Sequence, residues 1–83
     1  MDNTELAAAL AKAIRRTRKR YGATQAGLAA ALGVNPKQVS QAESGRHVPT
    51  IPQLVRLFGA MGYESVRLVV GRRGARPVVV RVS

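Results

Sequence analysis

The chain has 83 residues, enough for one small domain, and its fourteen lysines and arginines outnumber four acidic residues to give a net charge of +10. That excess points to a polyanionic partner, above all nucleic acid. The absence of cysteine excludes disulfides and thiolate metal sites, and the single histidine, His47, cannot build a metal site without other good ligands. Because acid–base groups are so few, we expect no metal, no cofactor and no enzymatic activity.

A first helix is predicted over about residues 4–21. Asn3 or Thr4 is expected to cap it, and Gly22 to end it. Largely apolar residues recur at spacings of three and four along one face: Leu6, Leu10, Ile14, Thr17 and Tyr21. Basic side chains gather elsewhere on the helix, and since like charges repel, the clustering favours a bound partner over a merely solvated face. They are Lys12, Arg15, Arg16, Arg18, Lys19 and Arg20.

Two short helices joined by a tight link follow. The segment TQAGLAAALG predicts a helix capped by Thr24 and ended by Gly33. The segment PKQVSQAES predicts the next helix, capped by Asn35 and with Pro36 at its first position. A link this short fits a helix-turn-helix, in which the two helices cross at about 90–120°. The outer side of the later helix is polar without charge pairs, which suits hydrogen bonding to a partner. Its residues are Lys37, Gln38, Ser40, Gln41 and Ser44.

A fourth helix and a strand-like tail complete the chain. The segment TIPQLVRLFGAMG carries an apolar stripe of Leu54, Leu57, Phe58 and Met61. The runs ESVRLVV (64–70) and RPVVVRV (76–82), separated by GRRGA, predict a β-hairpin.

Residues 64–83 are expected to be a dimerisation extension of the helical domain at 1–63. Two strands alone are marginal in water, so a second chain that pairs strands with the first is the simplest cover. Whether the strands pair within one chain or between two stays open. The alternating residues expected at the contact are Val66, Leu68, Val70, Val78, Val80 and Val82. The turn arginines Arg72, Arg73 and Arg76 either reach a bound polyanion or keep a valine-rich hairpin soluble.

Residues 14–62 also carry a recognisable motif. It consists of IRRTR at 14–18, TQ at 24–25, LA at 28–29 and LG at 32–33, followed by Val39, Ser40, Glu43, Gly45, Pro49 and Leu54. This string resembles the XRE-type helix-turn-helix domain of phage repressors and Cro. The resemblance implies a mainly α fold of four to five helices, to which the C-terminal β-hairpin or strand pair is added.

The resemblance implies roles for individual residues. Residues 36–44 become the recognition helix, whose Lys37, Gln38 and Gln41 would touch base edges, since glutamine can bond bidentately to adenine and lysine can donate to guanine. Arg18 and Glu43 match a buried structural pair that ties the first helix to the recognition helix. Contacts to DNA phosphates are expected from Gln25, Asn35, Ser40, Ser44, Arg46 and Lys19.

Two features modify these assignments. Gln38 lies three residues after Asn35, so its side chain could instead bond back to the helix cap. Gly27 stands where the family favours glutamate, which removes a reciprocal cap and costs up to about 1 kcal/mol of helix propensity.

These features predict a small bacterial regulator that binds double-stranded DNA sequence-specifically, as a homodimer on a palindromic operator, and represses by excluding polymerase. The tail also resembles DNA-binding antitoxins of toxin–antitoxin operons, which implies a cognate toxin partner. The alternatives are a phage or host repressor without a toxin, and an RNA- or ribosome-associated cofactor of the same fold. No apolar run approaches the roughly 18 residues that span a membrane, and no signal segment precedes the first helix. We therefore expect a cytoplasmic, nucleoid-associated protein.

Overall fold

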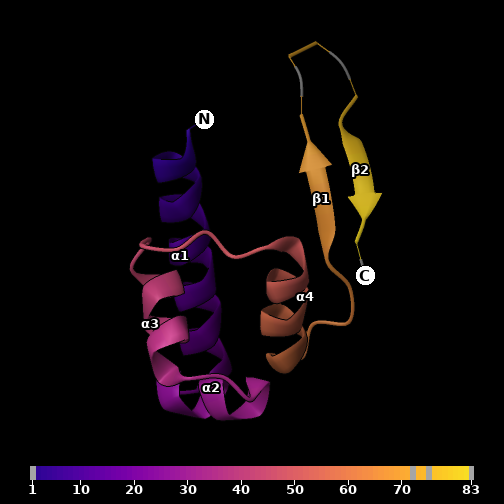
Figure 1. Ribbon diagram of the computed structural model, residues 1–83. Coiled ribbons are helices and arrows are strands. Elements are labelled where there is room, and N and C mark those ends of the chain that lie inside the picture. The colour runs from indigo at the N-terminus through magenta and orange to yellow at the C-terminus, as the bar shows by residue number, and fades with distance from the viewer. Residues whose placement is uncertain (1, 72, 75, 83) are drawn as a thin grey trace.

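All the predicted helices and both predicted strands are present. The computed structural model describes residues 2–71, 73–74 and 76–82. Within them lie helices α1 (Asn3–Tyr21), α2 (Gln25–Leu32), α3 (Pro36–Glu43) and α4 (Ile51–Ala60), and strands β1 (Arg67–Val70) and β2 (Val78–Arg81). The helices form one group, and the hairpin stands beside α4 on the side away from α1 and α3 (Figure 1). The predicted fold class is confirmed, with four helices in the described part of the chain.

Capping side chains set the starts of α2 and α3 as predicted. Thr24 Oγ1 accepts the Gly27 N–H at 2.9 Å, and Asn35 Oδ1 accepts the Lys37 N–H at 2.9 Å. The side chain of Gln38 makes no hydrogen bond to any described residue, so it does not bond back to the cap. It stays available to a partner.

The cap of α1 differs from the prediction. Asp2, rather than Asn3 or Thr4, accepts the Glu5 N–H at 2.8 Å, so the helix begins one residue earlier than expected. The physical reason is that an ionised carboxylate satisfies an orphan N–H and also interacts favourably with the positive end of the helix dipole.

The core lies between the four helices. The predicted stripe of α1 is wrong at both ends, since Leu6 is 36% exposed and Tyr21 is 58% exposed, whereas Ala7 and Ala11 are buried. The chain after α3 passes close to this part of α1, since a Cβ added to Gly45 would lie 3.8 Å from the Ala7 carbonyl oxygen. The residues of the central cluster are Ile14, Leu28, Ala29, Val39, Ala42, Leu57 and Met61.

The two strands pair with each other inside the chain, antiparallel, which settles a question the sequence left open. Both strands are shorter than predicted, at four residues each, and in the described part of the chain they form a sheet of two strands. The register places Leu68 opposite Val80 and Val70 opposite Val78, with Val66 and Val82 continuing the row, joined by a backbone hydrogen bond of 2.9 Å. We call this surface the apolar hairpin face: Val66, Leu68, Val70, Val78, Val80 and Val82. The other side carries Arg67, Val69, Val79 and Arg81.

Every residue of β1 and β2 is exposed, so the helices do not cover either side of the sheet. In the turn, Arg73 and Arg76 are exposed, and Arg72 lies outside the described residues. None of the helices in the described part is both long and apolar enough to cross a membrane.

Candidate nucleic-acid interface

A tight link sets the angle between α2 and α3. Gly33 adopts φ +69°, a left-handed conformation that glycine takes without strain. Its N–H donates to the Ala30 carbonyl oxygen at 3.2 Å, and the Val34 N–H donates to the Ala29 carbonyl oxygen at 3.0 Å. These bonds close α2 within one residue, so that α3 can begin directly after its cap and pack against α2.

α3 presents a polar side opposite its buried side. Val39 is buried in the core, whereas Lys37, Gln41 and Ser44 follow at spacings of four and three and therefore share the opposite side. Ser40 is also exposed and flanks them. The Ser44 hydroxyl donates to the Gln41 carbonyl oxygen at 3.1 Å, which leaves its oxygen open as an acceptor. This side can enter a groove without displacing any core residue.

Gln38 lies on a different side of α3 from Lys37. It lines a pocket of about 220 Å³ between α3 and α4, together with Gln41, His47, Gln53 and Arg56. The candidate base contacts therefore divide. Gln38 and Gln41, three residues apart, both line this pocket at the edge of α3 nearer to α4, whereas Lys37 does not line it.

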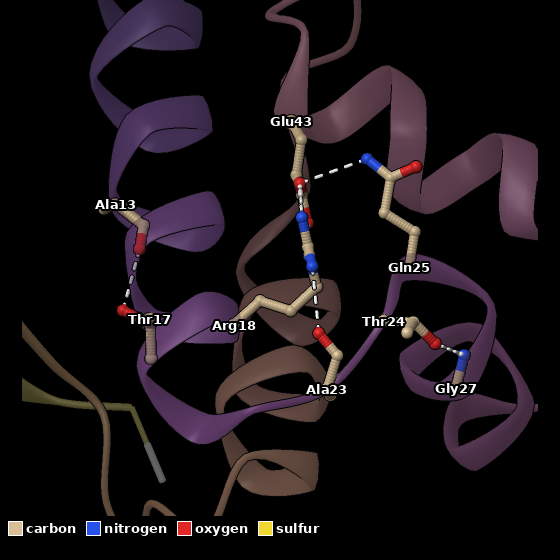
Figure 2. A network of polar contacts seen from close by, with 8 residues as sticks. All are labelled: Ala13, Thr17, Arg18, Ala23, Thr24, Gln25, Gly27 and Glu43. Atoms are coloured by element: carbon tan, nitrogen blue, oxygen red, sulfur yellow. Dashed lines mark hydrogen bonds and ion pairs between the residues drawn. The ribbon is translucent and has the colours of Figure 1, made fainter.

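A buried ion pair joins α1 to α3 (Figure 2). Arg18 Nε donates to Glu43 Oε2 at 2.6 Å, and Arg18 Nη2 donates to Glu43 Oε1 at 2.9 Å. Arg18 Nη1 also donates to the Ala23 carbonyl oxygen at 2.9 Å, in the link between α1 and α2. Arg18 is 9% exposed and Glu43 is 8% exposed. The structure thus brings this pair together in the bidentate geometry that gives such pairs their strength and direction.

Gln25 joins the same network from α2. Its Nε2 donates to Glu43 Oε1 at 3.1 Å, and Figure 2 shows its side chain reaching from the start of α2 toward α3. Sequence reasoning assigned Gln25 only to a phosphate and missed this contact, for which no local pattern gives a signal. Because the amide has a second N–H, Gln25 can keep this bond and still donate to a phosphate.

Burial alone would raise the pKa of Glu43, because a carboxylate loses hydration in the protein interior. The hydrogen bonds from Arg18 and Gln25, with the charges of Arg18 and Arg15, outweigh burial and hold the pKa of Glu43 below its ordinary value. The hydrogen bond to Glu43 raises the pKa of Arg18, against the opposing effect of burial. Both groups are therefore charged at neutral pH.

The lowered pKa of Glu43 predicts a loss of stability in acid. A depressed carboxyl pKa contributes stability that is fully present above the unfolded-state value, about 4.3, and is lost as the pH falls through the lower folded-state value. The free energy of unfolding, measured by urea titration with circular dichroism, should therefore decline below about pH 4.3. Glu43→Gln should be less stable at pH 7 and show a flatter acid limb. An unchanged acid limb would contradict the assignment.

The remaining phosphate candidates lie at the surface. Lys19 on α1 and Arg46 in the loop after α3 are both exposed. His47 Nε2 lies 3.3 Å from Gln53 Oε1, so this histidine contacts the start of α4. No group of three His, Cys, Asp or Glu side chains that could hold a metal ion occurs among the residues described.

The sequence was compared with protein-family models, with curated proteins and with solved structures. A search of the curated proteins and a search of the solved structures each gave no significant match. The model of one family matches residues 9–68, which include most of α1, all of α2, α3 and α4, and the start of β1. The match spans well over half of the sequence, and the tight link and buried packing of α2 on α3 agree with it. The chain belongs to the helix-turn-helix domain family.

Proposed function

We propose that the chain is a non-enzymatic transcriptional regulator that binds double-stranded DNA sequence-specifically as a homodimer and acts as a repressor in the cytoplasm. The observation that carries the proposal is the firm placement of α3. The Arg18–Glu43 pair and Gln25 hold it against α1 and α2 while its polar side faces solvent. A reading helix that is ordered before binding loses less entropy on DNA.

In this proposal the residues of the interface divide by task. Lys37, Gln38 and Gln41 read base edges in the major groove, where amide and ammonium groups distinguish adenine and guanine. The other polar and basic residues contact phosphates, which set the position of the helix without reading sequence. They are Gln25, Asn35, Ser40, Ser44, Arg46 and Lys19.

The apolar hairpin face supports the homodimer. A two-stranded sheet exposed on both sides is marginal in water, and a second hairpin packed against this face would cover six apolar side chains on each chain. Because β1 and β2 already pair within the chain, we place the contact between faces rather than between strand edges. A two-fold pair would present two α3 helices to half-sites about 34 Å apart, and occupying a promoter would exclude polymerase.

Selection from random duplexes tests the reading role of α3. The enriched sites should show two-fold symmetry. Gln41→Ala should relax base preference at one position in each half-site, with a loss of discrimination of about 1–3 kcal/mol. Lys19→Ala should weaken binding equally for all sequences or leave it unchanged. Failure to enrich any site would overturn the proposal, as would Gln41→Ala leaving the selected sequence unchanged.

Salt should weaken DNA binding steeply, because each neutralised phosphate releases counterions. If Lys19 and Arg46 of both protomers contact phosphates, affinity should fall about a hundredfold between about 50 and 200 mM salt. Fluorescence anisotropy with a labelled duplex measures the slope. A flat response contradicts the phosphate contacts, and competition by RNA as strong as by the selected duplex would favour an RNA-associated role.

A cognate toxin is a second candidate partner. The hairpin side that carries Val69 and Val79 would stay exposed in the dimer, since these residues are 60% and 53% exposed and lie opposite the apolar hairpin face. Co-expression with the product of the neighbouring gene tests this role: a stable complex that Val69→Glu disrupts supports an antitoxin. If no complex forms, the regulator acts without a toxin.

A further inference from the structure

A basic stripe runs along the side of α1 that faces away from α3. Lys12, Arg16 and Arg20 are four residues apart, so they follow one another along the helix over about 12 Å. Ala11 and Arg18, in contrast, lie on the buried side that packs against α3 and the core. We call Lys12, Arg16 and Arg20 the outer stripe. Its direction separates it from the groove that α3 would enter.

No acidic side chain of the described residues forms an ion pair with the outer stripe. All three side chains are exposed, and none forms an ion pair within residues 2–71, 73–74 and 76–82. The acidic groups of α1, Asp2 and Glu5, lie at its other end. Three like charges held in line repel one another, and a partner of opposite charge would relieve that repulsion.

A pocket of about 260 Å³ lies at the C-terminal end of the outer stripe. Its walls come from the last turn of α1 and from the residues that follow α4. Tyr21 and Tyr63 are 58% and 48% exposed, and Met61 beneath them is buried. The Tyr63 ring packs edge-on against Phe58 with centroids 5.8 Å apart, which orients it in the free protein. We call this the tyrosine pocket: Thr17, Arg20, Tyr21, Met61, Gly62 and Tyr63.

The geometry points to a binding surface for an acidic segment of a protein partner. Its carboxylates pair with the outer stripe, and one of its apolar side chains enters the tyrosine pocket. Tyrosine, arginine and methionine are the residues that protein interfaces favour. An acidic helix can repeat carboxylates at the four-residue spacing of the stripe, whereas a nucleic-acid strand needs successive stacking platforms, and this surface offers one pocket. Because the surface faces away from α3, DNA and the partner can bind together.

A peptide pair provides the test. One labelled amphipathic peptide carries glutamates at i, i+4 and i+8 and one leucine, and its matched peptide carries lysines instead. The full chain should bind the glutamate peptide in fluorescence anisotropy and not the lysine peptide. Arg16→Glu combined with Arg20→Glu should lower the affinity for the glutamate peptide by about tenfold or more and should give binding to the lysine peptide. The gain of binding to the lysine peptide would show that the variant is folded. Tyr21→Ala should weaken the glutamate peptide about tenfold.

Gln41→Ala is the control for the DNA surface, since it should weaken duplex DNA and leave peptide affinity unchanged. The double variant of the stripe should weaken duplex DNA less than it weakens the glutamate peptide, since Arg16 and Arg20 flank the proposed phosphate contact Lys19 but lie on the side of α1 away from α3. Equal binding of the two peptides overturns the inference. The inference also fails if the double variant loses as much affinity for duplex DNA, or for a single-stranded oligonucleotide, as it loses for the glutamate peptide. That result would make the outer stripe a nucleic-acid surface.

Discussion

Arg18→Met should lower the free energy of unfolding by about 3–5 kcal/mol, because it leaves the buried Glu43 carboxylate without its cation. The variant also loses the bond from Arg18 to the Ala23 carbonyl oxygen. A core of this size supplies net stability of similar magnitude, about 3–5 kcal/mol, so the variant should be largely unfolded at 37 °C. Thermal and urea unfolding followed by circular dichroism measure the change.

Two further variants separate the ion pair from the loss of a long side chain. Arg16→Met, at an exposed position of the same helix, should change stability by less than about 0.5 kcal/mol. Arg18→Met combined with Glu43→Leu should recover most of the loss, because no unpaired charge stays buried. If Arg18→Met cost no more than Arg16→Met, the pair would not hold α1 to α3. In the recovered double variant Gln25 loses its acceptor, so DNA affinity should remain reduced although the fold returns.

Leu68→Glu should convert the proposed dimer to a monomer. Leu68 lies in the apolar hairpin face, opposite Val80, and a carboxylate there would be buried without a partner in the dimer, at a cost of several kcal/mol. The dissociation constant of the dimer, measured by sedimentation, should rise by about a hundredfold or more. Affinity for a two-fold operator should fall with it, since a single α3 reads only one half-site.

Val69→Glu is the matched control. It introduces the same charge one residue along β1, on the other side of the hairpin. It should leave the mass in solution unchanged, because Val69 does not lie in the proposed contact. A dimer that survives Leu68→Glu, or one that Val69→Glu disrupts equally, would remove the apolar hairpin face as the dimer interface.

The starts of α2 and α3 could be read from local chemistry. Thr24 and Asn35 cap their helices by bonding to N–H groups two or three residues away, and Gly33 supplies a conformation that few other residues adopt. Such interactions depend on neighbours in the chain, so a single sequence contains them. The two strands were equally visible as alternating valine-rich runs.

The features that the sequence did not predict share a different cause. Spacing alone could not show that Ala7 and Ala11, rather than Leu6 and Tyr21, face the core, because the buried side of α1 depends on where α3 and the following chain pack against it. It could not show that Gln25 bonds to Glu43 across 18 positions of sequence. It also left open whether the two strands pair within one chain.

Composition and local pattern were thus sufficient for the basic character, the helices, the strands and the polar side of α3, because charge, capping and periodicity act over a few residues. The folded molecule was needed for the buried face of α1, the third member of the Arg18–Glu43 network and the pocket that Gln38 and Gln41 line without Lys37. It also revealed the outer stripe beside the tyrosine pocket. These features depend on how whole elements approach one another in space, and packing between distant segments leaves no fixed spacing in the chain.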